Sequence, residues 1–221
     1  YDRTNRWHSP AYLVKMAKHM KAKYATDFLL FYDENLLAIN LAAKNVWLPE
    51  LCRLWIKEGL QPTCSRLGIA HDPATCTDGI HWGGTSHATL AEPKLLKLMR
   101  EAGCSQLLYG YESFSARILK NVGKGATPET NERTLKLTLE AGIRPIPNQI
   151  MGFPDEFFDS LIDCVEAWER MGIQVKPFFA TAYPGTEWYN KYKDKILAQY
   201  GGDLDAYLLD LGDATKPTGN I

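Results

Sequence analysis

The stretch that decides the fold runs from Leu107 to Ser113 and reads Leu-Leu-Tyr-Gly-Tyr-Glu-Ser. An apolar run ends there in a glycine and two polar residues, as a buried strand does where it leaves a sheet. Three other strand-like runs end in similar polar or glycine-rich tips, at residues 28–35, 147–156 and 180–186. Ligands of parallel α/β sheets bind at the carboxyl ends of the strands, so the four tips predict one composite site for a polar small molecule.

Glycines mark the ends of four helix-like segments, at Gly59, Gly103, Gly142 and Gly172. A glycine just past a helix can take the left-handed conformation that closes it. A strand-like run follows each of these glycines at once, except the first. Successive glycines among the four are 30 to 44 residues apart, which is the size of a βα unit. The alternation predicts an α/β fold with a parallel sheet or open barrel, its strands in sequence order.

Five strands are expected, at about residues 27–33, 80–86, 105–111, 144–151 and 174–182. The connection from Gln61 to Gly79 is long for an α/β domain and lacks alternation, so we expect a surface excursion there. A strand at 62–69 is the alternative.

Helices are expected from apolar stripes and capping residues. Ser9 and Pro10 form an N-cap and first-turn pair, and residues 187–200 read as a helix followed by a short helix and a polar tail. Apolar residues mark the buried face of a helix near 160–171, namely Leu161, Ile162, Val165 and Trp168. The expected division is residues 1–186 for the sheet-bearing core and 187–221 for a helical extension and tail.

The composition excludes several classes of function. The 221 residues are 45% hydrophobic with a formal net charge of −1, so neither nucleic acid nor a membrane surface is an expected partner. No apolar run is long enough to cross a bilayer. Five scattered cysteines do not form a disulfide framework, which indicates the cytoplasm. The chain begins with Tyr1, and we expect that a preceding segment of the same protein is missing.

The polar tips carry the candidate binding residues. Asp33 and Glu34 could accept hydrogen bonds from a cationic amine, or form a helix-capping turn. Glu112 could hold both hydroxyls of a ribose, or be a solvated loop residue. Gly152 and Tyr183 lie in sharp corners that could frame a flat heterocycle, or be plain tight turns.

Histidines offer another interpretation. His71, His81 and His87 lie within a short stretch and could serve a metal-dependent hydrolase, although their spacing matches no compact ligand motif. The Gly123-Lys124-Gly125 segment lacks the rest of a phosphate-binding loop, so a flexible loop that leads into a helix is the better interpretation.

The order of the tips resembles the core of radical S-adenosylmethionine enzymes, in particular the branch with an N-terminal cobalamin-binding domain. The similarity runs nearly end to end. It rests on six segments, Arg6–Pro10, Phe31–Asn35, Met99–Gly103 followed by Gly110–Ser113 (Gly-x-Glu-Ser), Leu119–Thr127 (Leu…Lys-Gly-x-Thr), Ile150–Glu156 (Ile-x-Gly-Phe-Pro-x-Glu) and Tyr183–Thr186 (Tyr-Pro-Gly-Thr). The resemblance implies a partial barrel of six βα units, here without its first strand, that holds an iron–sulfur cluster and S-adenosylmethionine at its open rim.

The resemblance also implies a role for each matching residue. Asp33 and Glu34 would face the methionine amine, and Ser113 would lie near the methionine carboxylate. Glu112 would hold the ribose. The adenine would be framed by Ile150, Gly152 and Tyr183.

Two departures from the family pattern bear on activity. The Cys-x-x-x-Cys-x-x-Cys motif that ligates the [4Fe-4S] cluster is absent, so its ligands are expected outside this chain and no metal ligands within it. The family often has an arginine near position 87, where this chain has His87.

The sequence therefore predicts the core of a radical S-adenosylmethionine enzyme. In the intact protein, reductive cleavage would give a 5′-deoxyadenosyl radical that acts on a small-molecule substrate, with cobalamin-dependent methyl transfer or cyclisation left open. This chain alone is expected to be inactive. The rivals are a nucleoside-binding barrel module without chemistry and the metal-dependent hydrolase.

Overall fold

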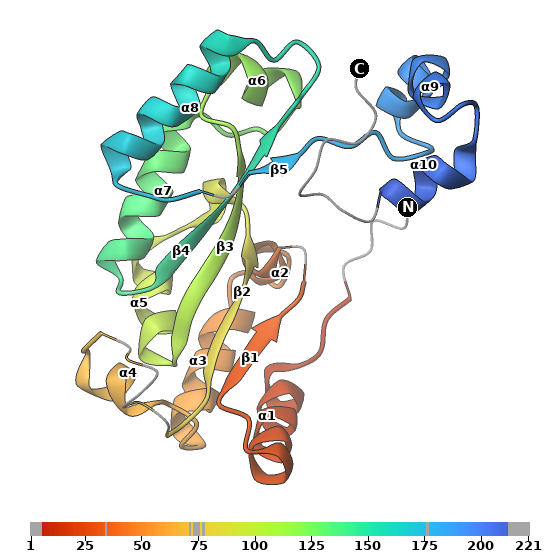
Figure 1. Cartoon of the computed structure of the whole chain (residues 1–221). Coiled ribbons are helices and arrows are strands. Elements are labelled where there is room, and N and C mark those ends of the chain that lie inside the picture. The colour runs from red at the N-terminus through yellow and green to blue at the C-terminus, as the bar shows by residue number, and fades with distance from the viewer. Residues whose placement is uncertain are drawn as a thin grey trace. The chain divides into compact units, whose positions relative to one another are not determined.

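The computed structural model in Figure 1 describes residues 6–33, 35–70, 72, 76, 78–175 and 177–211. These residues form two compact units. The first unit comprises Tyr1–Gly110 and Glu129–Pro147, and the second comprises Tyr111–Pro128 and Asn148–Ile221.

All the strands belong to one parallel sheet. Its order is β1-β2-β3-β4-β5, which is also the order along the chain. The strands are β1 (Phe28–Phe31), β2 (His81–Ser86), β3 (Cys104–Glu112), β4 (Arg144–Met151) and β5 (Phe178–Phe179). The expected α/β class, with parallel strands in sequence order as in a partial barrel, is confirmed.

The first unit is built on β1, β2 and the start of β3, which lie side by side in Figure 1. Phe28 is in register with His81, and Trp82 with Cys104. The helices are α1 (Pro10–Tyr24), α2 (Leu36–Ala42), α3 (Trp47–Lys57), α4 (Thr63–Leu67), the 3₁₀ helix η1 (Ala88–Leu90), α5 (Pro93–Glu101) and α7 (Pro128–Glu140). Helix α3 packs against both α1 and α5.

Two buried tryptophans centre the core of the first unit. The rings of Trp55 and Trp82 lie 6.3 Å apart, and both side chains are fully buried. Their indole N–H groups donate to backbone carbonyls, that of Trp55 to Ile80 (3.3 Å) and that of Trp82 to Ala102 (3.0 Å). Each large apolar side chain is thus buried without an unsatisfied donor.

The second unit contains α6 (Ala116–Asn121), α8 (Phe158–Met171), α9 (Glu187–Gln199) and α10 (Leu204–Asp210). Helices α9 and α10 share an aromatic core in which Tyr189 stacks on Tyr207 at 5.9 Å. The Tyr207 hydroxyl donates to the Ala182 carbonyl (2.6 Å) and so fastens α10 to the segment before α9. No helix among the described residues has the length and apolar character needed to span a membrane.

The sequence predicted most boundaries and missed some details. Gly59, Gly103, Gly142 and Gly172 all have positive φ, as predicted for residues that close helices. The alternative strand at 62–69 is wrong, because residues 63–67 form helix α4. Strand β5 is shorter than the expected 174–182.

The predicted buried face of α8 is only partly right, since Leu161 and Trp168 are half-buried. Ile162 and Val165 are exposed, whereas the buried residues are Ser160, Cys164 and Ala167. The most buried side chains of the helix are small, and a search for large apolar residues does not find them.

Asn35 is a capping residue that can be tested directly. Its side-chain oxygen accepts the Ala38 amide (3.1 Å) at the start of α2. We expect Asn35→Ala to lower the free energy of unfolding by about 1 kcal/mol, because the amide loses its acceptor. Asn35→Asp keeps the acceptor and should retain the wild-type midpoint in denaturant titration. Equal losses in both variants would contradict the capping role.

Candidate functional site

The first candidate residue, Asp33, follows the carboxyl end of β1 in the first unit. Its side chain is exposed, and its backbone carbonyl accepts a hydrogen bond from the Thr85 hydroxyl of β2. Because Asn35 caps α2, the helix-capping alternative applies to Asn35, and the Asp33 carboxylate is exposed to solvent. The neighbouring candidate, Glu34, lies outside the described residues.

Glu112 is the last residue of β3 and belongs to the second unit, and its φ is positive, at 59°. Its Oε1 accepts a hydrogen bond from the Lys124 ammonium (2.6 Å), and the two side chains are only 17% and 21% exposed. The Glu112 carbonyl accepts a second bond from the Gln149 side chain (2.6 Å). Glu112 is thus an ordered, ion-paired carboxylate rather than a solvated loop residue.

Ser113 is fully buried beside Glu112. Its hydroxyl lies 3.4 Å from the Cys164 sulfur and accepts the Ser115 amide (3.0 Å), while the Phe114 amide donates to the same sulfur (3.3 Å). The expected role of Ser113 at a methionine carboxylate stays a prediction, and it would require the hydroxyl to become accessible.

The corner after β4 is shaped by Glu156. Gly152 has φ +82°, and a Cβ added there would meet nothing within 4 Å. The Gly152 amide donates to Glu156 Oε2, and the Oε1 of Glu156 is buried with no hydrogen-bond partner among the described residues. Half-buried Ile150 lies just before this corner and pairs with Phe178.

Tyr183 begins the corner that leads into α9. Its side chain is half exposed, and its carbonyl accepts hydrogen bonds from both the amide (3.0 Å) and the hydroxyl (2.7 Å) of Thr186. Thr186 in turn caps α9 by accepting the Tyr189 amide (3.2 Å). The corner is a rigid turn that leaves the tyrosine ring accessible.

The described histidines do not form the metal site of the alternative hydrolase. His81 opens β2 and His87 follows its last residue, so the strand holds them roughly 20 Å apart, too far to share one ion. The His87 ring interacts with Thr89 (2.8 Å), where it caps η1. His71 lies outside the described residues. His81 instead lies beside Cys64 and Cys76.

Sequence reasoning missed the partners of Glu112. Lys124 was interpreted as part of a flexible loop, and Gln149 was not singled out. Glu112 and Lys124 are 12 residues apart, with the short helix α6 between them. This spacing is the only sign of the ion pair in the sequence, and spacing alone does not predict one.

Comparison with known proteins decides the family. Residues 1–167 match the radical SAM superfamily. The chain belongs to this superfamily. The radical SAM core is 34% identical over 108 residues to an uncharacterized methyltransferase, PH0819, of Pyrococcus horikoshii, which covers 48% of this chain and 24% of that protein. It is 26% identical over 121 residues to bacteriochlorophyllide d C-12(1)-methyltransferase of Chlorobaculum tepidum, covering 53% of this chain and 26% of that protein.

Solved structures support the same fold for this radical SAM core. The methyltransferase TsrM from Kitasatospora setae, with tryptophan and a SAM analogue bound, superposes with a TM-score of 0.62 at 19% identity, over 86% of this chain and 34% of that one. The cobalamin-dependent enzyme OxsB superposes with a TM-score of 0.58 at 20% identity, over 96% of this chain and 28% of that one. The core therefore spans about a quarter of its curated relatives and about a third of these enzymes.

Glu156 gives this radical SAM core a testable pH dependence. Burial raises the pKa of Glu156 above its ordinary value of 4.5, against the opposing effects of the Gly152 and Phe153 amides and Arg117. A raised pKa in the folded state means that stability is full below about 4.5 and falls as the pH rises through the folded value. We expect Glu156→Gln to raise the free energy of unfolding at pH 7 by less than about 1 kcal/mol, with the gain vanishing near pH 4.

Thermal unfolding at both pH values measures this difference. Glu166→Gln, on the exposed face of α8, is the matched control and should change neither midpoint. If Glu156→Gln were less stable than wild type at pH 7, the buried negative charge of Glu156 would not destabilise the folded chain, and the explanation would be wrong.

Proposed function

We propose that this chain is the S-adenosylmethionine-binding core of a radical SAM methyltransferase. One observation carries the proposal: residues of the family motifs follow the carboxyl ends of four parallel strands in chain order, Asp33 after β1, Glu112 at the end of β3, Gly152 after β4 and Tyr183 after β5. Parallel α/β folds bind their ligands at these ends.

The nucleoside half of S-adenosylmethionine fits the residues of the second unit. Glu112 offers an ordered carboxylate to a ribose diol, and its second oxygen, Oε2, is not the one that receives the Lys124 bond. The space within 4 Å of a Cβ at Gly152 is open, and half-exposed Tyr183 and half-buried Ile150 supply apolar surface. These features support a nucleoside site, with Asp33 and Glu34 assigned to the methionine amine.

The iron–sulfur cluster does not fit the described residues. Its ligands would be three closely spaced cysteines, whereas the described set of potential metal ligands is two cysteines and a histidine. We therefore assign the cluster, and the reductive cleavage that yields the 5′-deoxyadenosyl radical, to residues of the intact protein outside this chain. Our proposal for this chain is limited to binding and orienting the ligand.

Methyl transfer is the reaction that we favour for the intact protein. Both curated relatives are named as methyltransferases, and TsrM and OxsB have structures with cobalamin bound. A cobalamin-binding segment of the same protein and a small-molecule substrate are the partners that this proposal requires. A nucleoside-binding module without chemistry is the second candidate, and absence of the Cys-x-x-x-Cys-x-x-Cys motif from the complete gene would favour it.

Ligand binding to the isolated chain tests the assignment. We expect 5′-methylthioadenosine, the nucleoside half alone, to bind about as tightly as S-adenosylmethionine in calorimetric titration, because the iron that would chelate the amino acid end is not bound by this chain. Both should bind weakly. Micromolar affinity for S-adenosylmethionine with a large preference over the nucleoside would show that this chain makes the whole site.

The role of Glu112 can be tested with the same titration. We expect Glu112→Gln to weaken 5′-methylthioadenosine about 10-fold, the effect of one charge-assisted hydrogen bond. The 2′-deoxy analogue should bind wild type and variant alike, since it cannot present the diol. Glu166→Gln is the control. An unchanged affinity for the ribonucleoside in the Glu112 variant would remove Glu112 from the site.

A further inference from the structure

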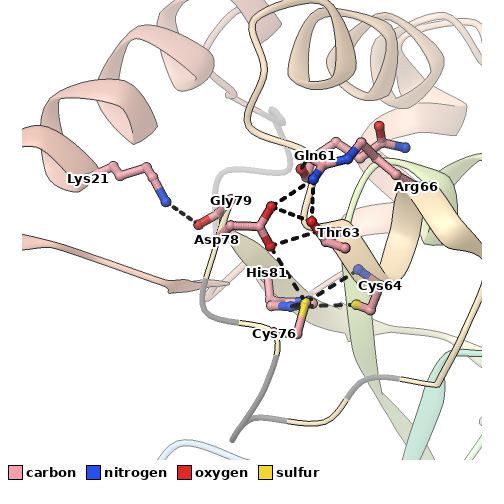
Figure 2. A network of polar contacts seen from close by, with 9 residues as sticks. All are labelled: Lys21, Gln61, Thr63, Cys64, Arg66, Cys76, Asp78, Gly79 and His81. Carbon is pink, nitrogen blue, oxygen red and sulfur yellow. Dashed lines mark hydrogen bonds and ion pairs between the residues drawn. The ribbon is translucent and has the colours of Figure 1, made fainter.

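Two cysteines and a histidine meet in the first unit, and none of them belongs to the strand-end residues discussed above. Cys64 lies in α4, Cys76 follows in the excursion, and His81 is the first residue of β2. Figure 2 shows the three side chains pointing toward one another. The His81 Nε2 is 3.8 Å from the Cys64 sulfur and 3.6 Å from the Cys76 sulfur, and all three atoms lie within 4.8 Å of one another.

These separations are those of ligands around a tetrahedral ion. With zinc–sulfur bonds of about 2.3 Å and zinc–nitrogen bonds of about 2.0 Å, the sulfur–nitrogen edges of a tetrahedron are about 3.5 Å long. The two observed distances exceed this value by 0.3 Å or less. A cation could therefore be bound with only a small adjustment of side chains that already converge.

The surroundings suit a thiolate-bound cation. The side chains of Cys64, Cys76 and His81 are 1%, 9% and 4% exposed. Two N–H groups point at the sulfurs: the Cys64 amide lies 3.4 Å from the Cys76 sulfur, and an Arg100 nitrogen lies 3.9 Å from the Cys64 sulfur. Donors of this kind stabilise and orient metal-bound thiolates.

A network of polar contacts around Asp78 also holds the backbone beside the cluster (Figure 2). Asp78 accepts hydrogen bonds from the Thr63 amide (2.9 Å), the Thr63 hydroxyl (2.6 Å) and Arg66 (2.9 Å), as Figure 2 shows. The Cys76 sulfur also lies 3.9 Å from Asp78 Oδ1. These bonds tie the start of α4 to the segment that leads back to β2.

We propose that Cys64, Cys76 and His81 bind one zinc-like divalent cation. Two sulfurs and an imidazole select a borderline-soft ion such as zinc over magnesium or calcium. Binding would release the two thiol protons to solvent and leave two thiolates that balance the two charges of the ion. Burial and attachment to β2 give the ion a structural role, in which it fastens the Gln61–Gly79 excursion to the sheet.

Cobalt(II), a spectroscopic substitute for zinc, tests the site in the whole chain after reduction and removal of metal by chelation. We expect one equivalent to bind, with the visible bands of tetrahedral thiolate coordination, and zinc to displace it. We expect Cys76→Ser to weaken binding by more than about 100-fold, because it removes a direct ligand. Cys52→Ala, which removes a buried cysteine outside the cluster, should bind cobalt like wild type.

Hydrogen exchange keeps the test independent of whether a variant folds well. In the wild-type chain, zinc should slow exchange of the described amides between 61 and 79 and leave α9 unchanged. Absence of stoichiometric binding by the reduced wild-type chain would overturn the proposal. So would Cys76→Ser binding cobalt as tightly as wild type, or a Cys64–Cys76 disulfide that persists in the freshly purified chain and excludes metal.

Discussion

The close approach of β2 to its neighbours is the constraint on which the first unit depends. A Cβ at Gly83 would lie 2.7 Å from the Gln106 carbonyl oxygen of β3, and one at Gly84 would lie 2.9 Å from Leu36 of α2. The oxygen belongs to backbone that cannot move without breaking the ladder between β2 and β3. Two glycines in a strand interior weaken its own preference for the extended state, so packing on both sides must hold β2 in place.

The rest of the first unit can be understood from that position. Trp82, next to Gly83, anchors β2 to the core through its ring and its bond to Ala102. His81 begins the strand and carries the imidazole of the proposed metal site. At the other end, Thr85 bonds to the carbonyl of Asp33 and Ser86 lies 3.4 Å from Asn35. Strand β2 therefore positions both the cysteine–histidine cluster and the tip of β1.

The sequence predicted those features that depend on local chemistry. Strand β4 was predicted with its observed boundaries, since a closing glycine precedes it and a glycine–proline corner follows it. Features that depend on contacts between distant residues were not predictable. Cys164 is a buried residue of helix α8 whose sulfur contacts Ser113 and Phe114, some 50 residues away. The metal ligands, separated by 12 and 5 residues, match no compact motif and meet only in the folded chain.

The ion pair between Glu112 and Lys124 changes the thermodynamics of any ligand that meets this carboxylate. A free glutamate loses rotamer entropy when it binds, and that loss reduces affinity. Here Lys124 fixes the carboxylate, and the Gln149 bond fixes the backbone behind it, before a ligand arrives. The Glu112 side chain therefore loses its rotamer entropy during folding and not during binding. A diol would meet a carboxylate that is already in position. Discrimination between diol and deoxy ligands should then be largely enthalpic.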